Sequence, residues 1–189
     1  LRGGNHSTKG GVGTASVSLG DGILVGAIVT TNAIGSIIDP DTGAVIAGPR
    51  TETRFENTMD FLVDDPPRLR DLIGIRNASN TVVGVVATNV GLDKKAAIRF
   101  AGAGQDAITM AVRPAHMSGD GDTVFALATG AHPRLSGEEA IAGIEDRLRA
   151  AAMRAMVGAI LSSIEHATGL GGVPSAAEHA ASFGRKANS

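Results

Sequence analysis

Apolar and polar positions along the first part of the chain follow the pattern of a β-hairpin. Residues 12–19 alternate between apolar and polar side chains, and residues 23–31 begin with a continuous apolar run. Gly20-Asp21-Gly22 separates the two segments, and an Asp-Gly pair between such segments is a strong turn signal. The second segment is apolar almost throughout, which predicts a central strand.

A second apolar run predicts the strand on which the interpretation of the chain depends. Residues 80–89 contain four β-branched valines, and a run of this kind is typical of a strand buried on both faces. A small polar cluster precedes the run. Thr81 therefore lies where a loop ends and a rigid element begins, a position at which a scaffold can hold a nucleophile. The alternative is that Thr81 is only a β-branched residue at the start of a strand.

The rest of the pattern predicts shorter strands and two helices. Extended segments are expected at 34–38, 44–48, 112–116 and 124–129, a small-residue helix after Leu92, and a long amphipathic helix from Gly137 to about Thr168. Residues 49–79 predict an irregular surface connection with one or two helical turns at 69–75, and the pattern weakens after Gly169 towards a fraying end. This order, without strict βαβ alternation, predicts an α/β (α+β) fold with helices packed on a sheet.

Composition narrows the class of protein. The 189 residues, 43% of them hydrophobic, predict a single globular domain spanning 1–189. The chain has no cysteine, which excludes a disulfide scaffold, a thiolate metal site and a cysteine nucleophile. A net charge of −2 offers no electrostatic case for nucleic acid or an anionic membrane, and no apolar run is long enough to span a bilayer. The chain begins at Leu1, so we expect a fragment or a processed product.

Two acidic residues before the 124–129 strand form the second candidate site. Asp120 and Asp122 flank Gly121, and carboxylates this close repel unless a cation or a shared proton relieves them. The string lacks the remaining ligands of a calcium loop. The functional interpretation is that the pair orients an amine, either that of Lys9 or the α-amine of a freed Thr81. The alternative is a turn capped by aspartate side chains.

The glycine-rich segment after Lys9 and the histidines give weaker indications of function. Lys9-Gly10-Gly11-Val12-Gly13-Thr14 differs from a phosphate-binding loop, because no strand precedes it, Thr14 stands where the lysine is needed, and a strand pattern follows. The five histidines have no spacing typical of metal ligands or catalytic triads, and we expect them at the surface or at helix caps. They are His6, His116, His132, His166 and His179.

A cut before Thr81 would create a complete catalytic unit. Attack of the Thr81 hydroxyl on the preceding carbonyl moves the chain onto Oγ, and hydrolysis then frees an α-amine with a pKa of about 7.7–8.0. A threonine activated by its own N-terminal amine is a known nucleophile.

Three strings support this hypothesis through a resemblance: residues 80–89, Arg113-Pro114-Ala115-His116 and residues 120–130. Together with the segment 9–16, they resemble the self-cleaving amidohydrolases of the DmpA and NylC type, which include L-aminopeptidase/D-esterases, β-peptidyl aminopeptidases and nylon-oligomer hydrolases. The resemblance implies a layered αββα sandwich, similar to that of ornithine acetyltransferase, and no cofactor or metal.

The resemblance also implies roles for individual residues. Thr81 corresponds to the nucleophile at a scissile Asn80–Thr81 bond, Lys9 to the active-site lysine, and Asn32 to an oxyanion donor. Asp120 and Asp122 correspond to the acidic pair of the nylon-hydrolase branch. Self-cleavage would divide the chain into 1–80 and 81–189, an α/β heterodimer expected to assemble into a tetramer in the cytoplasm and to act on small peptides or amide oligomers.

Two alternatives remain open. An acyltransferase of the ornithine acetyltransferase type uses a similar self-cut threonine and transfers the acyl group to an amine. The family also carries a long segment before the lysine. If the protein begins at Leu1 without this segment, a non-catalytic remnant is the other alternative.

Overall fold

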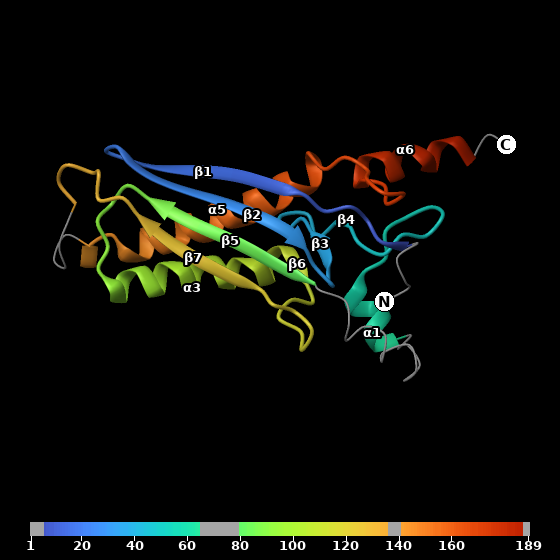
Figure 1. The fold of residues 1–189 in the computed structure, drawn as a ribbon, viewed down its shortest axis with the longest axis horizontal. Coiled ribbons are helices and arrows are strands. Elements are labelled where there is room, and N and C mark those ends of the chain that lie inside the picture. The colour runs from blue at the N-terminus through green and yellow to red at the C-terminus, as the bar shows by residue number, and fades with distance from the viewer. Residues whose placement is uncertain (1–5, 65–79, 136–140, 187–189) are drawn as a thin grey trace.

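The computed structural model describes residues 6–64, 80–135 and 141–186 of the chain (Figure 1). A four-stranded sheet organises it, with strands in the order β1 (Val12–Gly20), β2 (Ile23–Asn32), β5 (Thr81–Thr88) and β7 (Thr123–Ala128). β1 and β5 each pair antiparallel with β2, whereas β5 and β7 are parallel. The predicted hairpin and the central position of its second strand are confirmed.

The turn of the hairpin depends on its glycines. Gly20, Asp21 and Gly22 have φ values of 85°, 50° and 79°. Glycine adopts this left-handed region without steric cost, and aspartate tolerates it better than most other residues. The Gly-Asp-Gly string therefore permits a tight reversal that joins β1 to β2.

A smaller sheet lies beside the end of the first one at which β2 finishes (Figure 1). Its strands are short and run in the order β4 (Val45–Ala47), β3 (Ser36–Ile38) and β6 (Val112–Arg113). Both pairs in this sheet are antiparallel. The extended segments predicted at 34–38 and 44–48 are thus confirmed.

Two long helices cover one face of the four-stranded sheet. α3 (Lys94–Ala111) contacts β5 and β7, and α5 (Glu145–Glu165) contacts β1 and β2. The Asp93 side chain accepts a hydrogen bond of 2.6 Å from the Ala96 amide, which caps α3 where the sequence pattern begins. Mixed α/β architecture with helices on a sheet is therefore confirmed.

The predicted start of the long helix at Gly137 lies outside the described residues, and residues 141–142 are helical. Residues 143–144 form a turn, and the regular helix α5 begins only at Glu145. Residues 136–140 lie outside the described part. Glycine at 143 disfavours a helix interior, which is consistent with an interruption at that point.

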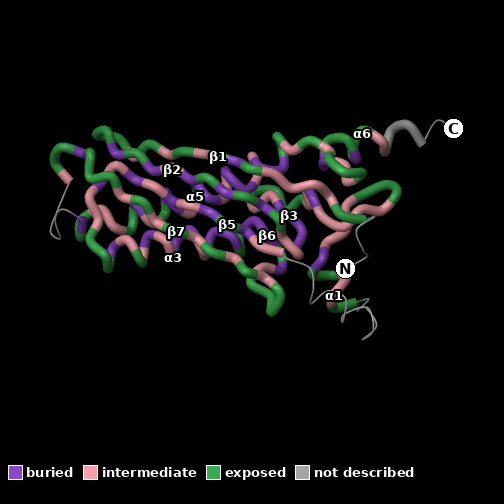
Figure 2. Tube along the Cα trace, viewed as in Figure 1, coloured by how far each residue is buried: buried purple, intermediate pink, exposed green. Residues whose placement is uncertain are grey.

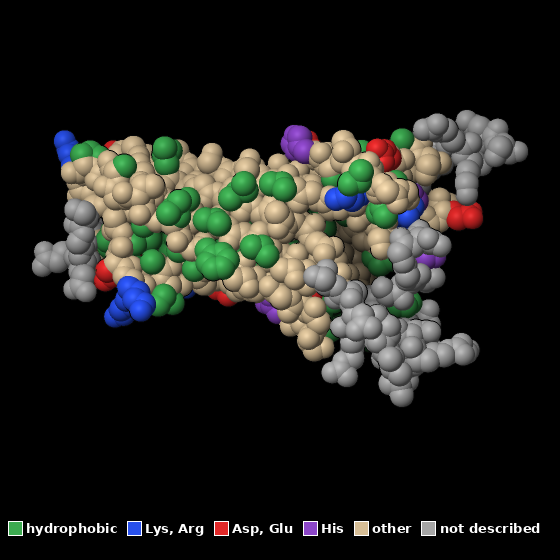
Figure 3. All heavy atoms as spheres, viewed as in Figure 1, with side chains coloured by type: hydrophobic (Ala, Val, Ile, Leu, Met, Phe, Trp, Pro, Cys, Tyr) green, Lys and Arg blue, Asp and Glu red, His purple; other side chains and the backbone are tan. Residues whose placement is uncertain are grey.

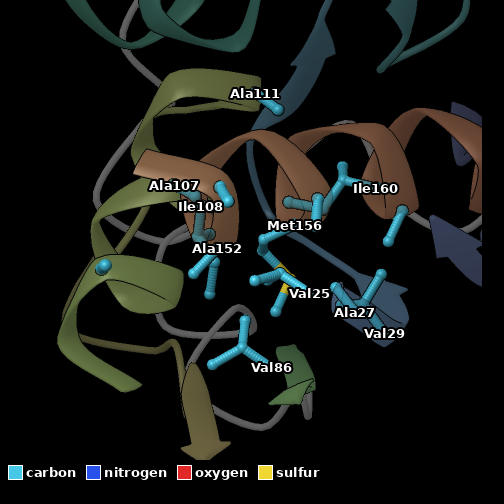
Figure 4. Packing of buried hydrophobic residues seen from close by; sticks show 14 of the residues in the cluster. Val25, Ala27, Val29, Val86, Ala107, Ile108, Ala111, Ala152, Met156 and Ile160 are labelled. Atoms are coloured by element: carbon cyan, nitrogen blue, oxygen red, sulfur yellow. The ribbon is translucent and has the colours of Figure 1, made fainter. Parts of the chain in front are cut away.

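The hydrophobic core lies between the four-stranded sheet and helices α3 and α5 (Figure 4). Alternate side chains of β2 and β5 point at α5 and α3, and small residues let the layers approach closely. A Cβ at Gly13 would overlap the backbone of α5 at Ala159 and Ser163, so only glycine permits this contact. The labelled core residues include Val25, Ala27, Val29, Val86, Ile108, Met156 and Ile160, all of them buried.

The opposite face of the sheet is open. Val82 is fully buried, whereas 40% of its neighbour Val83 is exposed, so the prediction that the 80–89 strand is buried on both faces is wrong. Burial alternates along the strands (Figure 2), and apolar side chains gather on the open face in Figure 3. The exposed large apolar residues of these strands are Val12, Leu24, Ile28, Val83, Phe125 and Leu127.

Two helices lie where none was predicted. α1 (Thr58–Asp64) interrupts the region expected to be irregular, and α6 (Ala176–Lys186) lies in the tail expected to lose its pattern. The helical turns predicted at 69–75 lie outside the described residues. No helix among the described residues is long and apolar enough to cross a membrane.

The sequence did contain a signal for α6. The Ser175 hydroxyl accepts a hydrogen bond of 3.2 Å from the Glu178 amide, and Glu178 Oε2 accepts one of 3.0 Å from the Ser175 amide. This reciprocal pair is a capping box, which a Ser-x-x-Glu string predicts.

Two glycines of α3 test the packing of this helix on the sheet. A Cβ at Gly104 would lie 2.8 Å from a Val124 methyl and 2.9 Å from a Val86 methyl, whereas nothing lies within 4 Å of one at Gly102. We expect Gly104→Ala to lower the free energy of unfolding by about 1–3 kcal/mol through overpacking. Gly102→Ala should raise it by about 0.5–1 kcal/mol through helix propensity. Urea unfolding measures both, and a change of the same sign in both variants would contradict this packing.

Candidate active site

Thr81 and Asn32 lie opposite each other at one end of the four-stranded sheet. Thr81 is the first residue of β5 and Asn32 the last residue of β2, and the antiparallel register pairs their Cα atoms. Directly opposed residues share a face of the sheet. Because Val82 points at the helices, Thr81 and Asn32 lie on the open face.

The Thr81 hydroxyl contacts the carbonyl of the residue before it. Thr81 Oγ1 donates a hydrogen bond of 2.6 Å to the Asn80 oxygen. The Gly121 amide donates one of 3.2 Å to the same oxygen. A Cβ at position 121 would lie 2.9 Å from Thr81 Oγ1, so glycine leaves room for the hydroxyl. The Asn80 carbonyl is thus held by two donors, one of which is the hydroxyl able to attack it.

Asp122 binds the peptide group that follows Thr81. Its Oδ1 accepts a hydrogen bond of 2.9 Å from the Val82 amide, immediately before the parallel pairing of β5 with β7 begins. Its Oδ2 lies 2.9 Å from His116 Nδ1 and accepts a bond of 3.3 Å from the His116 amide. Only 3% of the Asp122 side chain is exposed. This carboxylate is therefore buried and fixed by its partners.

Asp120 has one oxygen bound and one without a partner. Oδ2 accepts a hydrogen bond of 2.9 Å from the Met117 amide, while Oδ1 is buried and receives none from the described residues. Burial raises the pKa of the Asp120 carboxyl, the Met117 amide opposes this shift, and the charge of Asp122 adds to it. Asn80 and Asp120 form an isolated parallel bridge. Asp120 Oδ1 is thus an available hydrogen-bond acceptor, on the residue that pairs with Asn80 next to the Asn80–Thr81 bond.

Lys9 lies at the same end of the sheet, on the segment that leads into β1. Gly10 packs against the backbone of Thr31 and Asn32, and the Thr31 amide donates a 2.9 Å bond to the Gly11 oxygen. Lys9 Nζ donates a 2.7 Å bond to the Gly10 oxygen. In the described part of the chain it forms no ion pair with Asp120 or Asp122, so the interpretation that the acids orient Lys9 stays a prediction.

The five predicted site residues are therefore brought to one end of one sheet, where β1, β5 and β7 start and β2 ends. The structure adds one residue that the sequence interpretation missed, His116, which was expected only at the surface or at a cap. No spacing rule connects His116 to Asp122, because the loop between them makes the contact. The described residues contain no group of three or more His, Asp or Glu side chains able to hold a metal ion.

The other histidines divide between the two expected places and the interior. His6 is exposed and contacts the Arg50 oxygen, and His166 contacts the Ser162 oxygen at the end of α5. His132 and His179 are buried, so the prediction of surface or capping positions is wrong for these two.

Comparison with known sequences adds independent information. The sequence model of peptidase family S58 matches residues 4–177. An uncharacterised aminopeptidase of Mycobacterium leprae is 36% identical over 178 residues, which cover 88% of this chain and 47% of that protein. A 6-aminohexanoate-oligomer endohydrolase of Paenarthrobacter ureafaciens is 29% identical over 126 residues, covering 63% of this chain and 33% of that protein. The chain spans about half the length, or less, of these relatives.

A solved structure shares the fold. The L-aminopeptidase D-Ala-esterase/amidase of Ochrobactrum anthropi, described as a variant of the Ntn-hydrolase fold, superimposes with a TM-score of 0.53 at 17% identity. The alignment covers 97% of this chain and 50% of that one. At this level of identity the likeness establishes the common fold.

The raised pKa of Asp120 predicts that this carboxyl lowers the folding stability of the protein by an amount that depends on pH. The folded state holds this proton more tightly than the unfolded chain, so stability falls as pH rises from the unfolded pKa of 3.8 through the folded pKa. In an uncut Thr81→Ala chain, Asp120→Asn should therefore raise the melting temperature by a few degrees near pH 7 and by progressively less towards pH 4.

Thermal unfolding at several pH values measures this difference, with the exposed Asp106→Asn as the control. A stabilisation by Asp120→Asn that grows as pH falls would contradict the assignment.

Proposed function

Because the chain belongs to peptidase family S58, we propose that Thr81 is the nucleophile of an amide hydrolase and becomes an N-terminus through self-cleavage of the Asn80–Thr81 bond. One observation carries the proposal: the Thr81 hydroxyl lies 2.6 Å from the oxygen of the carbonyl that it would attack. The same oxygen receives the Gly121 amide, a donor suited to the negative charge that develops there.

Self-cleavage proceeds by an acyl shift from nitrogen to oxygen. Thr81 Oγ bonds to the Asn80 carbonyl carbon, the bond from that carbon to the Thr81 nitrogen breaks, and the hydroxyl proton passes to this nitrogen. Water then attacks the resulting ester. The products are a carboxylate on Asn80 and a Thr81 that carries both a free hydroxyl and a free α-amine.

Hydrolysis of a substrate uses the same hydroxyl with a new base. The Thr81 amine accepts the hydroxyl proton while Oγ attacks the substrate carbonyl, and the leaving amine departs with that proton. Water, deprotonated by the same amine, then releases the acid from the acyl-enzyme. An α-amine pKa of about 7.7–8.0 leaves a useful fraction of free base near neutral pH.

The neighbouring residues have roles in this scheme. Asn32, opposite Thr81 on the open face, donates to the oxyanion of the substrate, and Lys9 adds positive charge at the same end of the sheet. Asp122 holds the Val82 amide and so fixes Thr81. The unpartnered Oδ1 of Asp120 is a buried acceptor beside the cleavage point, suited to receive the new ammonium group.

The names of the relatives indicate the substrate class. Those of Mycobacterium leprae and Paenarthrobacter ureafaciens are an aminopeptidase and an oligomer endohydrolase, and both names favour hydrolysis over acyl transfer to an amine. We therefore propose small peptides or amide oligomers as substrates. After cleavage, the pairing of β2 with β5 would hold residues 1–80 and 81–189 together as an α/β heterodimer, and we propose that such heterodimers form a tetramer.

Replacement of the nucleophile tests the proposal. Thr81→Ala should leave an uncut chain without amidase activity, whereas Thr81→Ser, which keeps a hydroxyl, should still cleave itself. Intact-mass spectrometry and N-terminal sequencing should find a wild-type fragment that starts Thr-Val-Val-Gly. Wild-type activity in the Thr81→Ala variant would show that Thr81 is not the nucleophile.

The space at Gly121 gives a second test. In Gly121→Ala the added methyl group lies 2.9 Å from Thr81 Oγ1, so we expect self-cleavage to slow by about 10-fold or more as the hydroxyl is displaced. Gly119→Ala is the matched control, because its methyl group meets only Ile34 at an ordinary 3.6 Å. Gel electrophoresis measures the cleavage rate of each variant. Equal rates in the two variants would show that the hydroxyl does not act from this position.

A further inference from the structure

His116 is the one side chain that bonds to the Asp122 carboxylate among the residues that the structure describes. Its Nδ1 lies 2.9 Å from Oδ2, and its backbone amide donates to the same oxygen over 3.3 Å. His116 has a φ of 57°, an uncommon left-handed conformation for a residue other than glycine. The loop thus adopts an unusual conformation at the residue that contacts this carboxylate twice.

The contact continues through the carboxylate to the nucleophile. Asp122 Oδ1 accepts the Val82 amide, which belongs to the peptide group joining Thr81 to Val82. The two oxygens of one carboxylate therefore bind the loop on one side and the nucleophile's strand on the other. Rotation of the carboxylate away from His116 would also break the bond to Val82.

The chemistry of the pair defines the donor. An ionised Asp122 only accepts hydrogen bonds, so the proton of the 2.9 Å contact lies on His116 Nδ1. The Gln105 amide of α3 donates instead to the Asp122 backbone oxygen over 3.1 Å and lies 3.4 Å from His116 Nδ1. The Asp120 carboxylate also interacts electrostatically with His116. The Asp122 side chain is 3% exposed, so loss of a donor would leave a buried charge under-satisfied.

We propose that His116 is a positioning residue for Thr81: its Nδ1–H holds Asp122 so that Oδ1 stays on the Val82 amide and the Thr81 hydroxyl stays at the Asn80 carbonyl. This inference rests on the proposed role of Thr81. It assigns His116 no contact with substrate, so its loss should lower kcat and the self-cleavage rate while KM stays nearly constant.

Substitutions of equal shape and opposite chemistry test the donor. Asparagine and aspartate both tolerate a positive φ, but only asparagine offers an N–H near the place of Nδ1. We expect His116→Asn to cleave itself within about threefold of the wild-type rate and His116→Asp to be slower by about 100-fold, the effect of a displacement of about 1 Å. If the aspartate variant fails to fold, His116→Gly replaces it in the test. Glycine also tolerates the φ value and offers no N–H near Nδ1, so this variant should be slowed as well. His166→Asn, remote from Asp122, is the control.

A second readout separates this inference from the proposed function. In an uncut Thr81→Ala background, amide hydrogen exchange at Val82 reports the bond to Asp122 without any catalysis. His116→Asp or His116→Gly should speed this exchange, and His116→Asn should preserve its protection. Equal exchange in all variants, or loss of cleavage in His116→Asn as large as in His116→Gly, would overturn the inference. A wild-type chain that stays uncut would instead overturn the proposed function.

Discussion

The register between β2 and β5 is the constraint on which the site depends. It places Asn32 opposite Thr81, and the parallel pairing of β5 with β7 then brings Gly121 and Asp122 alongside the same strand end. Side chains alternate between the faces of a strand, so a slip of one residue would turn Thr81 towards the helices. The complete burial of Val82 and Val86 opposes such a slip, because it would expose both side chains to water. Packing on one face of the sheet thereby sets the chemistry of the other.

The site also carries unfavourable charge that folding must compensate. Asp122 is buried but accepts hydrogen bonds on both oxygens, whereas Asp120 keeps an unpartnered buried oxygen and a raised pKa. An unsatisfied buried acceptor of this kind is uncommon in proteins, and a catalytic role is one established explanation for it. In our account the missing donor is the α-amine that appears only after the chain is cut. The uncut chain would thus hold a site that becomes complete through its own reaction.

Local chemistry explains what the sequence predicted and what it did not. The Asp-Gly turn, the Asp93 cap and the valines of β5 each act over a few residues, so their elements could be predicted closely. The burial of β5 could not, because an apolar strand looks the same whether one or both faces are covered. The resemblance supplied the five site residues, and the structure then placed them at one end of the sheet. His116 was missed because its contact depends on the path of a loop, and α6 was missed although its capping box was present in the sequence.

The measurement that tests the central claim most directly is peptide mapping after reaction with a slowly hydrolysed activated ester. Mass spectrometry would locate the acyl group and the N-terminus of the peptide that carries it. Our account predicts an acyl group on the Thr81 hydroxyl, in a peptide that begins at Thr81. An acyl group on another residue, or a labelled peptide that runs unbroken through Asn80 and Thr81, would contradict it.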